Sequence, residues 1–110
     1  MPSPPSSLPP ELNIILKLAK ELVENNNGKL YFVYLPEINR YNKSNSLEKN
    51  NIKLQIKKIV SDLGIEFIDI DKEVFQKEKN PLKLFPFEQY GHYNSEGYKK
   101  VSLKIYQKTK

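Results

Sequence analysis

An unbroken run of apolar and aromatic residues in the first third of the chain sets narrow limits on its fold. The run has no polar alternation, and it reads Leu30-Tyr31-Phe32-Val33-Tyr34-Leu35. Such a run predicts a strand that is covered on both faces, as in parallel sheets under helices. Pro36 should end this strand, over residues 29–35, because proline cannot donate a hydrogen bond to a neighbouring strand.

A helical pattern and a second strand follow, so that residues 29–70 form a predicted β-α-β unit. Ser46 is expected as the N-cap of the helix, with Glu48 in its first turn and Gly64 at its end. The buried face of this helix recurs at helical spacing: Ile52, Ile56, Ile59, Val60 and Leu63. The second strand covers residues 65–70, and the right-handed rule for such connections makes the two strands parallel.

Two more helices are predicted towards the ends of the chain. The first spans about residues 10–26 and ends in the sequence Asn25-Asn26-Asn27-Gly28, because Asn and Gly tolerate left-handed geometry. Its apolar residues form one stripe: Leu12, Ile15, Leu16, Ala19, Leu22 and Val23. The last helix is capped by Asn94 and turns inward Tyr98, Val101, Ser102 and Ile105. Its lysines 99, 100, 104 and 108 are expected to face water.

The order of elements predicts a three-layer α/β domain with at least two parallel strands flanked by helices. Residues 1–8 are a Pro/Ser-rich flexible tail, and 9–110 form one domain or the C-terminal part of one. Between strand and last helix, Asp71 is expected to cap a short turn and 76–89 to be a loop. Because two parallel strands bury too little surface alone, we expect self-association or a missing N-terminal segment that supplies further strands.

Composition argues against several classes of function. The net charge of +5 comes from 18 basic residues, all lysines except Arg40, scattered without an arginine cluster or a basic face interleaved with aromatics. Nucleic acid is therefore not an expected partner. Cysteine is absent, which excludes disulfides, thiolate metal ligands and a cysteine nucleophile. With a single histidine and no suitable ligand spacing, no metal or cofactor site is expected.

No targeting or membrane signal is found in the sequence. No apolar run approaches the roughly 18 residues that a membrane-spanning helix needs. The N-terminus has neither the basic start nor the apolar centre of a signal peptide. The compartment is therefore unknown.

The most informative segment holds the chain's single histidine: Gly91-His92-Tyr93-Asn94-Ser95-Glu96-Gly97-Tyr98. A loop-borne imidazole at a helix entrance is where α/β enzymes often keep a general base. Together with the two strand patterns, this segment resembles the C-terminal half of an SGNH/GDSL-type hydrolase, whose last motif is His-x-Asn-x-x-Gly. The resemblance covers most of residues 11–108, and His92, Asn94 and Gly97 match the motif.

The resemblance implies a flavodoxin-like α/β/α fold and a serine hydrolase acting on an acyl ester or acylated carbohydrate. His92 would be the general base. The family's acidic residue lies three before the histidine, where this chain has Gln89, so Glu88 is the candidate acidic partner. The family's Gly-Asp-Ser block is absent, and serines 3, 6 and 7 lie in the Pro-rich tail. The chain by itself is therefore expected to be inactive.

Simpler interpretations and other functions stay open beside this one. Glu88 is also explained as a solvated loop charge, and Asp69 and Asp71 as strand-end and N-cap residues. Arg40 and Tyr41, after the first strand, either line a ligand site or are exposed loop residues. A non-catalytic α/β module that binds an acyl group, a carbohydrate or a protein is the main alternative function, and a basic adaptor for an acidic surface is a third.

Overall fold

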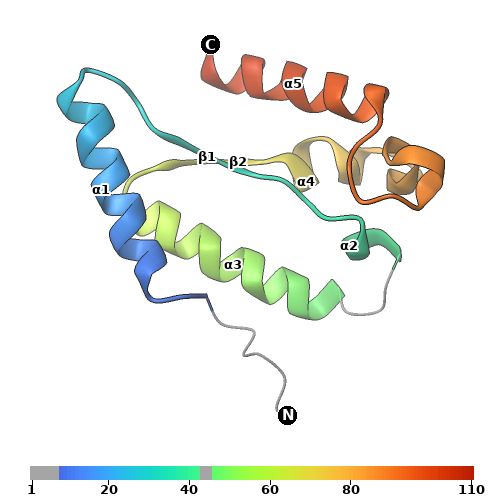
Figure 1. Ribbon diagram of the computed structural model, residues 1–110, viewed down its shortest axis with the longest axis horizontal. Helices are drawn as coiled ribbons and strands as arrows, with labels where there is room; N and C mark the ends of the chain where they lie inside the picture. The colour runs from blue at the N-terminus through green and yellow to red at the C-terminus, as the bar shows by residue number, and fades with distance from the viewer. Residues whose placement is uncertain (1–7, 43–45) are drawn as a thin grey trace. The chain divides into compact units, whose positions relative to one another are not determined.

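The computed structural model describes residues 8–42 and 46–110 and combines helices with one small sheet (Figure 1). Its longer elements are α1 (Glu11–Asn25), β1 (Tyr31–Tyr34), α3 (Ser46–Asp62), β2 (Glu66–Asp69) and α5 (Ser95–Thr109). Strands β1 and β2 are parallel and pair in a two-stranded sheet. The predicted combination of helices with two parallel strands is therefore confirmed, although each strand is shorter at both ends than the sequence indicates.

Short helical elements connect the longer ones. They are α2 (Asn39–Asn42), α4 (Ile70–Glu73) and three 3₁₀ turns, η1 (Phe75–Lys77), η2 (Pro81–Leu84) and η3 (Pro86–Glu88). The sequence predicted a plain loop over residues 76–89, and this was wrong. Proline begins two of the turns, where its fixed φ suits a helical start and its missing N–H costs nothing.

The chain divides into two compact units, and the division cuts both strands. Among the described residues, unit 1 contains 8–32 and 47–67, and unit 2 contains 33–42, 46 and 68–110. Each unit is described separately below.

In unit 1, helix α1 has two apolar faces instead of the single predicted stripe. One face is half-buried and consists of Leu12, Leu16, Ala19 and Val23. The other face, here called the α1 outer stripe, is exposed and consists of Ile14, Ile15, Leu18 and Leu22. Ile15 and Leu22, which the sequence placed with the buried residues, are therefore exposed. The helix ends as predicted, with Asn27 in left-handed geometry at φ 63°.

Helix α3 of unit 1 follows its sequence prediction closely. Val60 is fully buried, and the other members of the predicted face, Ile52, Ile56, Ile59 and Leu63, are half-buried. Gly64 ends the helix with φ 73°, a left-handed conformation that glycine adopts without a steric penalty. The side chains of Ser46 and Glu48, the predicted N-cap and first-turn acid, lie outside the described residues.

Unit 2 contains most of the buried side chains. Its core consists of Ile38, Ile68, Ile70, Val74, Phe75, Leu84, Phe85, Tyr93 and Val101. Phe75 packs against Phe85 and Tyr93 at ring-centroid distances of 5.5 and 5.0 Å. Full burial of each such side chain contributes roughly 1.5–3 kcal/mol, so this aromatic cluster is a major source of stability for unit 2.

The start of α4 corrects one prediction. Asp69, not Asp71, is the N-cap, and its carboxylate accepts a hydrogen bond from the backbone N–H of Lys72 at 3.0 Å. Asp71 lies within α4 and is fully buried. The predicted capping turn therefore exists, but it begins two residues earlier and leaves Asp71 available for another role.

Helix α5 is capped as predicted but is rotated from the predicted orientation. Asn94 accepts from the N–H of Gly97 at 2.8 Å, which confirms the N-cap. Gly97 and Val101 are buried, whereas Tyr98 and Ser102 are exposed. A Cβ on Gly97 would lie only 2.7 Å from the carbonyl oxygen of Leu84, so the helix approaches η2 through this glycine.

Ion pairs explain why two lysines of α5 differ from their predicted exposure. Lys99 and Lys108 are exposed as expected, but Lys100 and Lys104 are half-buried. Lys100 pairs with Glu78 at 2.7 Å, and Lys104 lies 3.9 Å from the carboxylate of Glu73.

No helix within the described residues has both the length and the apolar character that crossing a membrane requires.

Candidate functional site

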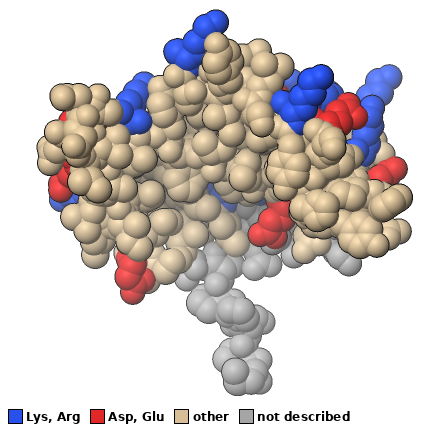
Figure 2. Space-filling model, turned by 45° about the horizontal axis from the view of Figure 1, so that its top comes forward, with Lys and Arg blue, Asp and Glu red and all other residues tan. Residues whose placement is uncertain are grey.

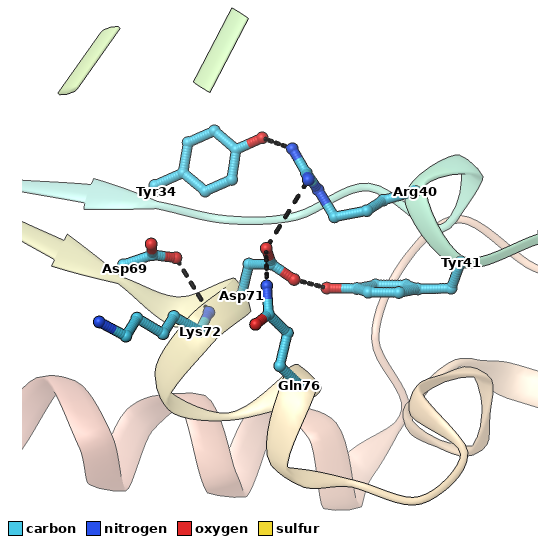
Figure 3. Close-up of polar contacts among 7 residues, drawn as sticks. All are labelled: Tyr34, Arg40, Tyr41, Asp69, Asp71, Lys72 and Gln76. Carbon is cyan, nitrogen blue, oxygen red and sulfur yellow. Dashed lines mark hydrogen bonds and ion pairs between the residues drawn. The ribbon is translucent and has the colours of Figure 1, made fainter. Parts of the chain in front are cut away.

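A buried polar cluster centred on Asp71 lies at the carboxyl ends of the two strands (Figure 3). The hydroxyl of Tyr41 donates to Asp71 Oδ1 at 2.5 Å, and the side-chain amide of Gln76 donates to Oδ2 at 2.7 Å. A guanidinium nitrogen of Arg40 lies 3.7 Å from Oδ2. We call these residues, with Tyr34, the Asp71 network. Because Asp71 is fully buried, these donors and the guanidinium charge compensate for its lost hydration.

The Asp71 network connects four elements of unit 2. Arg40 donates to the hydroxyl of Tyr34 at 2.6 Å, and its guanidinium lies over the Tyr34 ring at 5.5 Å. Tyr34 ends β1, Arg40 and Tyr41 lie on α2, Asp71 on α4 and Gln76 on η1. Burial, followed by the hydrogen bond to Asp71, raises the pKa of the Tyr41 hydroxyl. The network therefore holds the segment after β1 against the segment after β2.

Sequence reasoning missed this network. Arg40 and Tyr41 were expected to be pocket or loop residues, and Asp71 to be a cap. A signal was present, since parallel strands end at the same edge of a sheet and polar residues follow both strands. Its contacts join residues at and after the end of β1 to residues after the end of β2, so the network fixes the ends of the two strands.

Tyr93 positions the predicted catalytic segment within unit 2. Its side chain is buried, and its hydroxyl donates to the backbone carbonyl of Pro36 at 2.8 Å. Burial, with a smaller contribution from Tyr98, raises the pKa of this hydroxyl. Because Pro36 follows β1 by two residues, the hydrogen bond places the residue after His92 at the carboxyl end of that strand.

His92 is exposed and lines a hollow of about 290 Å³ at this place. The His92 hollow is lined by Leu35, Pro36, Glu37, Gly91, His92, Tyr93 and Tyr98. Its wall therefore combines the residues directly after β1 with the predicted motif. Ligands of α/β proteins are commonly bound at the carboxyl ends of strands. A general base for a bound ligand would be expected at this place.

The imidazole of His92 has one hydrogen bond within the described residues. Its Nδ1 lies 3.1 Å from the carbonyl oxygen of Tyr93. Glu88, the candidate acidic partner, instead accepts a hydrogen bond from the side-chain amide of Asn80 at 3.0 Å. The structure thus brings Glu88 to Asn80 and not to the imidazole.

The loop before His92 contains two consecutive residues in left-handed geometry. Phe87 has φ 53° and Glu88 has φ 59°, which is uncommon for residues with a side chain. Phe87 is 85% exposed, and its ring meets that of Tyr90 edge-on at 6.1 Å. These aromatic side chains therefore lie at the surface beside the motif.

The other motif residues have structural roles. Asn94 caps α5 and also donates its side-chain amide to the carbonyl of Lys83 at 2.7 Å. Gly97 allows the close approach to Leu84. Three serines have side chains that the structure describes, Ser61, Ser95 and Ser102, and none of them donates a hydrogen bond to His92.

A second hollow lies between η1 and α5 in unit 2 and contains paired charges. It measures about 290 Å³ and is lined by Glu73, Val74, Lys77, Glu78, Lys100, Leu103, Lys104 and Gln107. Figure 2 shows basic side chains, Lys and Arg, at several separate points of the visible face, some next to acidic residues. Across residues 8–42 and 46–110, no three histidine or acidic side chains gather as metal ligands do.

Comparison of the chain with models of known protein families found no match, and comparisons with curated proteins and with solved structures found none either. The resemblance of the segment Gly91–Tyr98 to the SGNH/GDSL motif therefore stays a prediction from the sequence.

Proposed function

We propose that this chain is the C-terminal portion of an SGNH/GDSL-like hydrolase that cleaves esters, with a three-layer, flavodoxin-like fold completed by a segment that supplies further strands. The observation that carries the proposal is the exposed imidazole of His92 in a hollow directly after β1. A general base must be accessible and held by a rigid scaffold. Tyr93 supplies the rigid part through its buried ring and its hydrogen bond to Pro36.

In the proposed reaction, His92 removes the proton from a serine hydroxyl while the serine oxygen attacks the ester carbonyl. The imidazolium then gives that proton to the leaving alcohol, and an acyl-enzyme remains. A water molecule then attacks the acyl-enzyme while His92 takes its proton. The imidazolium gives that proton to the serine oxygen, which releases the carboxylic acid and restores the serine. The serine belongs to the other segment, and this chain contributes the base and one wall of the substrate site.

The His92 hollow favours a small acyl group as substrate, either on a simple alcohol or on a carbohydrate. Its volume of about 290 Å³ is near the lower end of known ligand sites, roughly 300–1,000 Å³. Leu35, Pro36 and Tyr98 supply apolar surface, which suits a hydrocarbon chain better than a charged group.

A non-catalytic α/β binding module is the second candidate, and one observation favours it. None of the serines with described side chains reaches His92, so the described residues hold a base without a nucleophile. In that case the same hollow would bind an acyl or sugar group without cleaving it. The third candidate, a basic adaptor, is less well supported, since Lys77, Lys100, Lys104 and Lys108 are paired with Glu73 or Glu78.

The test begins with the coding sequence upstream of Met1. If it encodes a Gly-Asp-Ser segment, that segment is expressed together with residues 1–110 and assayed on p-nitrophenyl acetate. We expect turnover from the pair, none from residues 1–110 alone, and loss of turnover in the pair with His92→Ala. Glu88→Gln is the matched control and should leave most of the rate. Turnover that survives His92→Ala, or an upstream sequence without such a segment, would favour the binding module.

A further inference from the structure

We infer that the backbone carbonyl of Tyr93, and not a carboxylate, orients His92 and holds its neutral imidazole in the Nδ1–H tautomer. Tyr93 is thus a positioning residue, and its relevance to catalysis rests on the function proposed above. The observation is the distance of 3.1 Å between His92 Nδ1 and the Tyr93 oxygen. A carbonyl oxygen can only accept a hydrogen bond, so Nδ1 must be the donor.

The second nitrogen of the ring is consequently the proton acceptor. A neutral imidazole carries one N–H, and when Nδ1 holds it, Nε2 has a free lone pair. No hydrogen bond to Nε2 is formed within the described residues, and the side chain is exposed. Nε2 is therefore available to accept a proton from an incoming hydroxyl, which is what a general base requires.

The direction of the Tyr93 carbonyl is fixed by the peptide unit to which it belongs. The N–H of the same unit, on Asn94, donates to the carbonyl of Leu84 at 2.8 Å. In a planar trans peptide the N–H and C=O groups point in opposite directions. The contact with Leu84 on one side therefore turns the Tyr93 oxygen to the other side, where it meets His92.

Both ends of this peptide unit are held by the core of unit 2. The Tyr93 ring packs against Phe85 at 5.4 Å, and its hydroxyl donates to Pro36. Asn94 is bound through its cap of α5 and its bond to Lys83. The orienting carbonyl therefore belongs to a peptide unit that is held on both sides, although a carbonyl adds no full negative charge beside the imidazole.

The carboxylates near His92 are the competing explanation. Glu88 is hydrogen-bonded to Asn80, and its position is set by left-handed backbone geometry at Phe87 and Glu88. Glu37 lines the His92 hollow, but the one hydrogen bond of the imidazole goes to Tyr93. Substitution of either glutamate therefore separates the two explanations.

The tautomer can be measured without ambiguity because His92 is the single histidine in the chain. Long-range ¹H–¹⁵N spectra of the full chain are recorded at about pH 8.5, well above the ordinary histidine pKa of about 6.5. We expect Nδ1 to show the shift of a protonated ring nitrogen and Nε2 that of an unprotonated one. The ratio of Nδ1–H to Nε2–H should exceed that of the same chain in urea by roughly five- to tenfold, as expected for one net hydrogen bond.

Two sets of variants complete the experiment, with amide spectra as the check on folding. Glu88→Gln and Glu37→Gln should leave the tautomer ratio unchanged, and His92→Ala should shift the carbonyl ¹³C resonance of Tyr93. A folded chain in which Nε2–H predominates, or a ratio that falls in either glutamate variant, would overturn the inference. A correct tautomer together with failure of the serine-segment assay would instead reject the proposed hydrolase and leave the positioning role intact.

Discussion

Unit 1 and unit 2 bury their large side chains to very different extents. Unit 2 contains a continuous aromatic and aliphatic core, and its one fully buried carboxylate, Asp71, is bonded on both oxygens. In unit 1 the buried hydrophobic residues within the described ranges are Val60 and Ile65, and α1 has no buried residue. The four aliphatic side chains of the α1 outer stripe are each about 60% exposed.

Apolar side chains are therefore buried only where other elements cover them, and we expect unit 2 to contribute more of the stability than unit 1. The aromatic rings and 3₁₀ turns of unit 2 pack against one another, so water is excluded from the contacts between them. The predicted candidate residues His92 and Glu88 both lie in the better-packed unit, which is where a rigid site can be maintained. The four experiments below test the difference, in order of decreasing effect on the free energy of unfolding.

The largest effect is expected when the centre of unit 2 loses its charge. Asp71→Asn removes the buried negative charge that accepts hydrogen bonds from Tyr41 and Gln76 and lies 3.7 Å from the guanidinium of Arg40, which should lower the free energy of unfolding by about 3–5 kcal/mol. Asp62→Asn is the matched control in unit 1, because Asp62 is exposed and pairs with Lys58 at 3.0 Å. That change should cost roughly 0.3–0.5 kcal/mol. Urea unfolding followed by circular dichroism measures both, and equal effects would contradict the difference between the units.

A smaller but clear loss is expected at the contact between α5 and η2. The new methyl group of Gly97→Ala would meet the Leu84 carbonyl at 2.7 Å and Tyr93 Cβ at 3.0 Å. We expect a loss of about 1–3 kcal/mol in the free energy of unfolding, since two backbones must move apart. Gly91→Ala is the control, because a Cβ at Gly91 would meet no side chain or backbone from elsewhere in the structure. The idea fails if the two alanine variants melt at the same temperature.

A pH-dependent contribution is expected from the charges around Glu73. Burial acts to raise the pKa of Glu73, but Lys108, Lys77 and Lys104 outweigh it, and the pKa is lowered. A lowered folded-state pKa contributes stability that is fully present above the unfolded-state value of 4.5. This contribution is lost as the pH falls through the folded-state pKa. Glu73→Gln should therefore flatten the dependence of stability on pH between about pH 5 and pH 3. An unchanged profile in the variant would remove this role for Glu73.

The smallest effect on stability is expected on the α1 outer stripe. Leu18→Lys adds a charge to an exposed position, so the free energy of unfolding should change by no more than about 0.5 kcal/mol. The same change should reduce the self-association predicted for a chain with an exposed apolar stripe. Sedimentation velocity of both chains measures this, with Lys17→Ala on the same helix as the control. A wild-type chain that is monomeric at all concentrations would show that the stripe does not mediate self-association.

Local pattern predicted much of the fold but little of the packing around α1 and α5. The apolar spacing in α3 and the stop at Gly64 were correct, because helical periodicity and left-handed glycine are local properties. The inner face of α5 was partly wrong, since Tyr98 is exposed and Lys100 is half-buried. Hydropathy ranks a tyrosine above a lysine for burial, but it contains no information about the glutamate that pairs with the lysine.

The sequence likewise indicated only part of the candidate site. His92 was singled out by its motif, and the structure places it in a hollow lined by the residues directly after β1, but its catalytic role stays a prediction from the sequence. Its proposed orienting group was not predictable, because it is a backbone carbonyl and every residue has one. The acidic residue nearest in sequence, Glu88, is bonded to Asn80 instead.

The amino-acid sequence alone determined the helix and strand order, the Asn94 cap and the single imidazole, because spacing, capping and residue identity act over a few positions. Tertiary structure alone decided that Asp71 is the buried centre of a polar network and that Tyr93 connects His92 to the end of β1. Both depend on residues about 30 to 60 positions apart coming within hydrogen-bond distance. Such contacts form only when the core excludes water, and no local pattern records which partners will then meet.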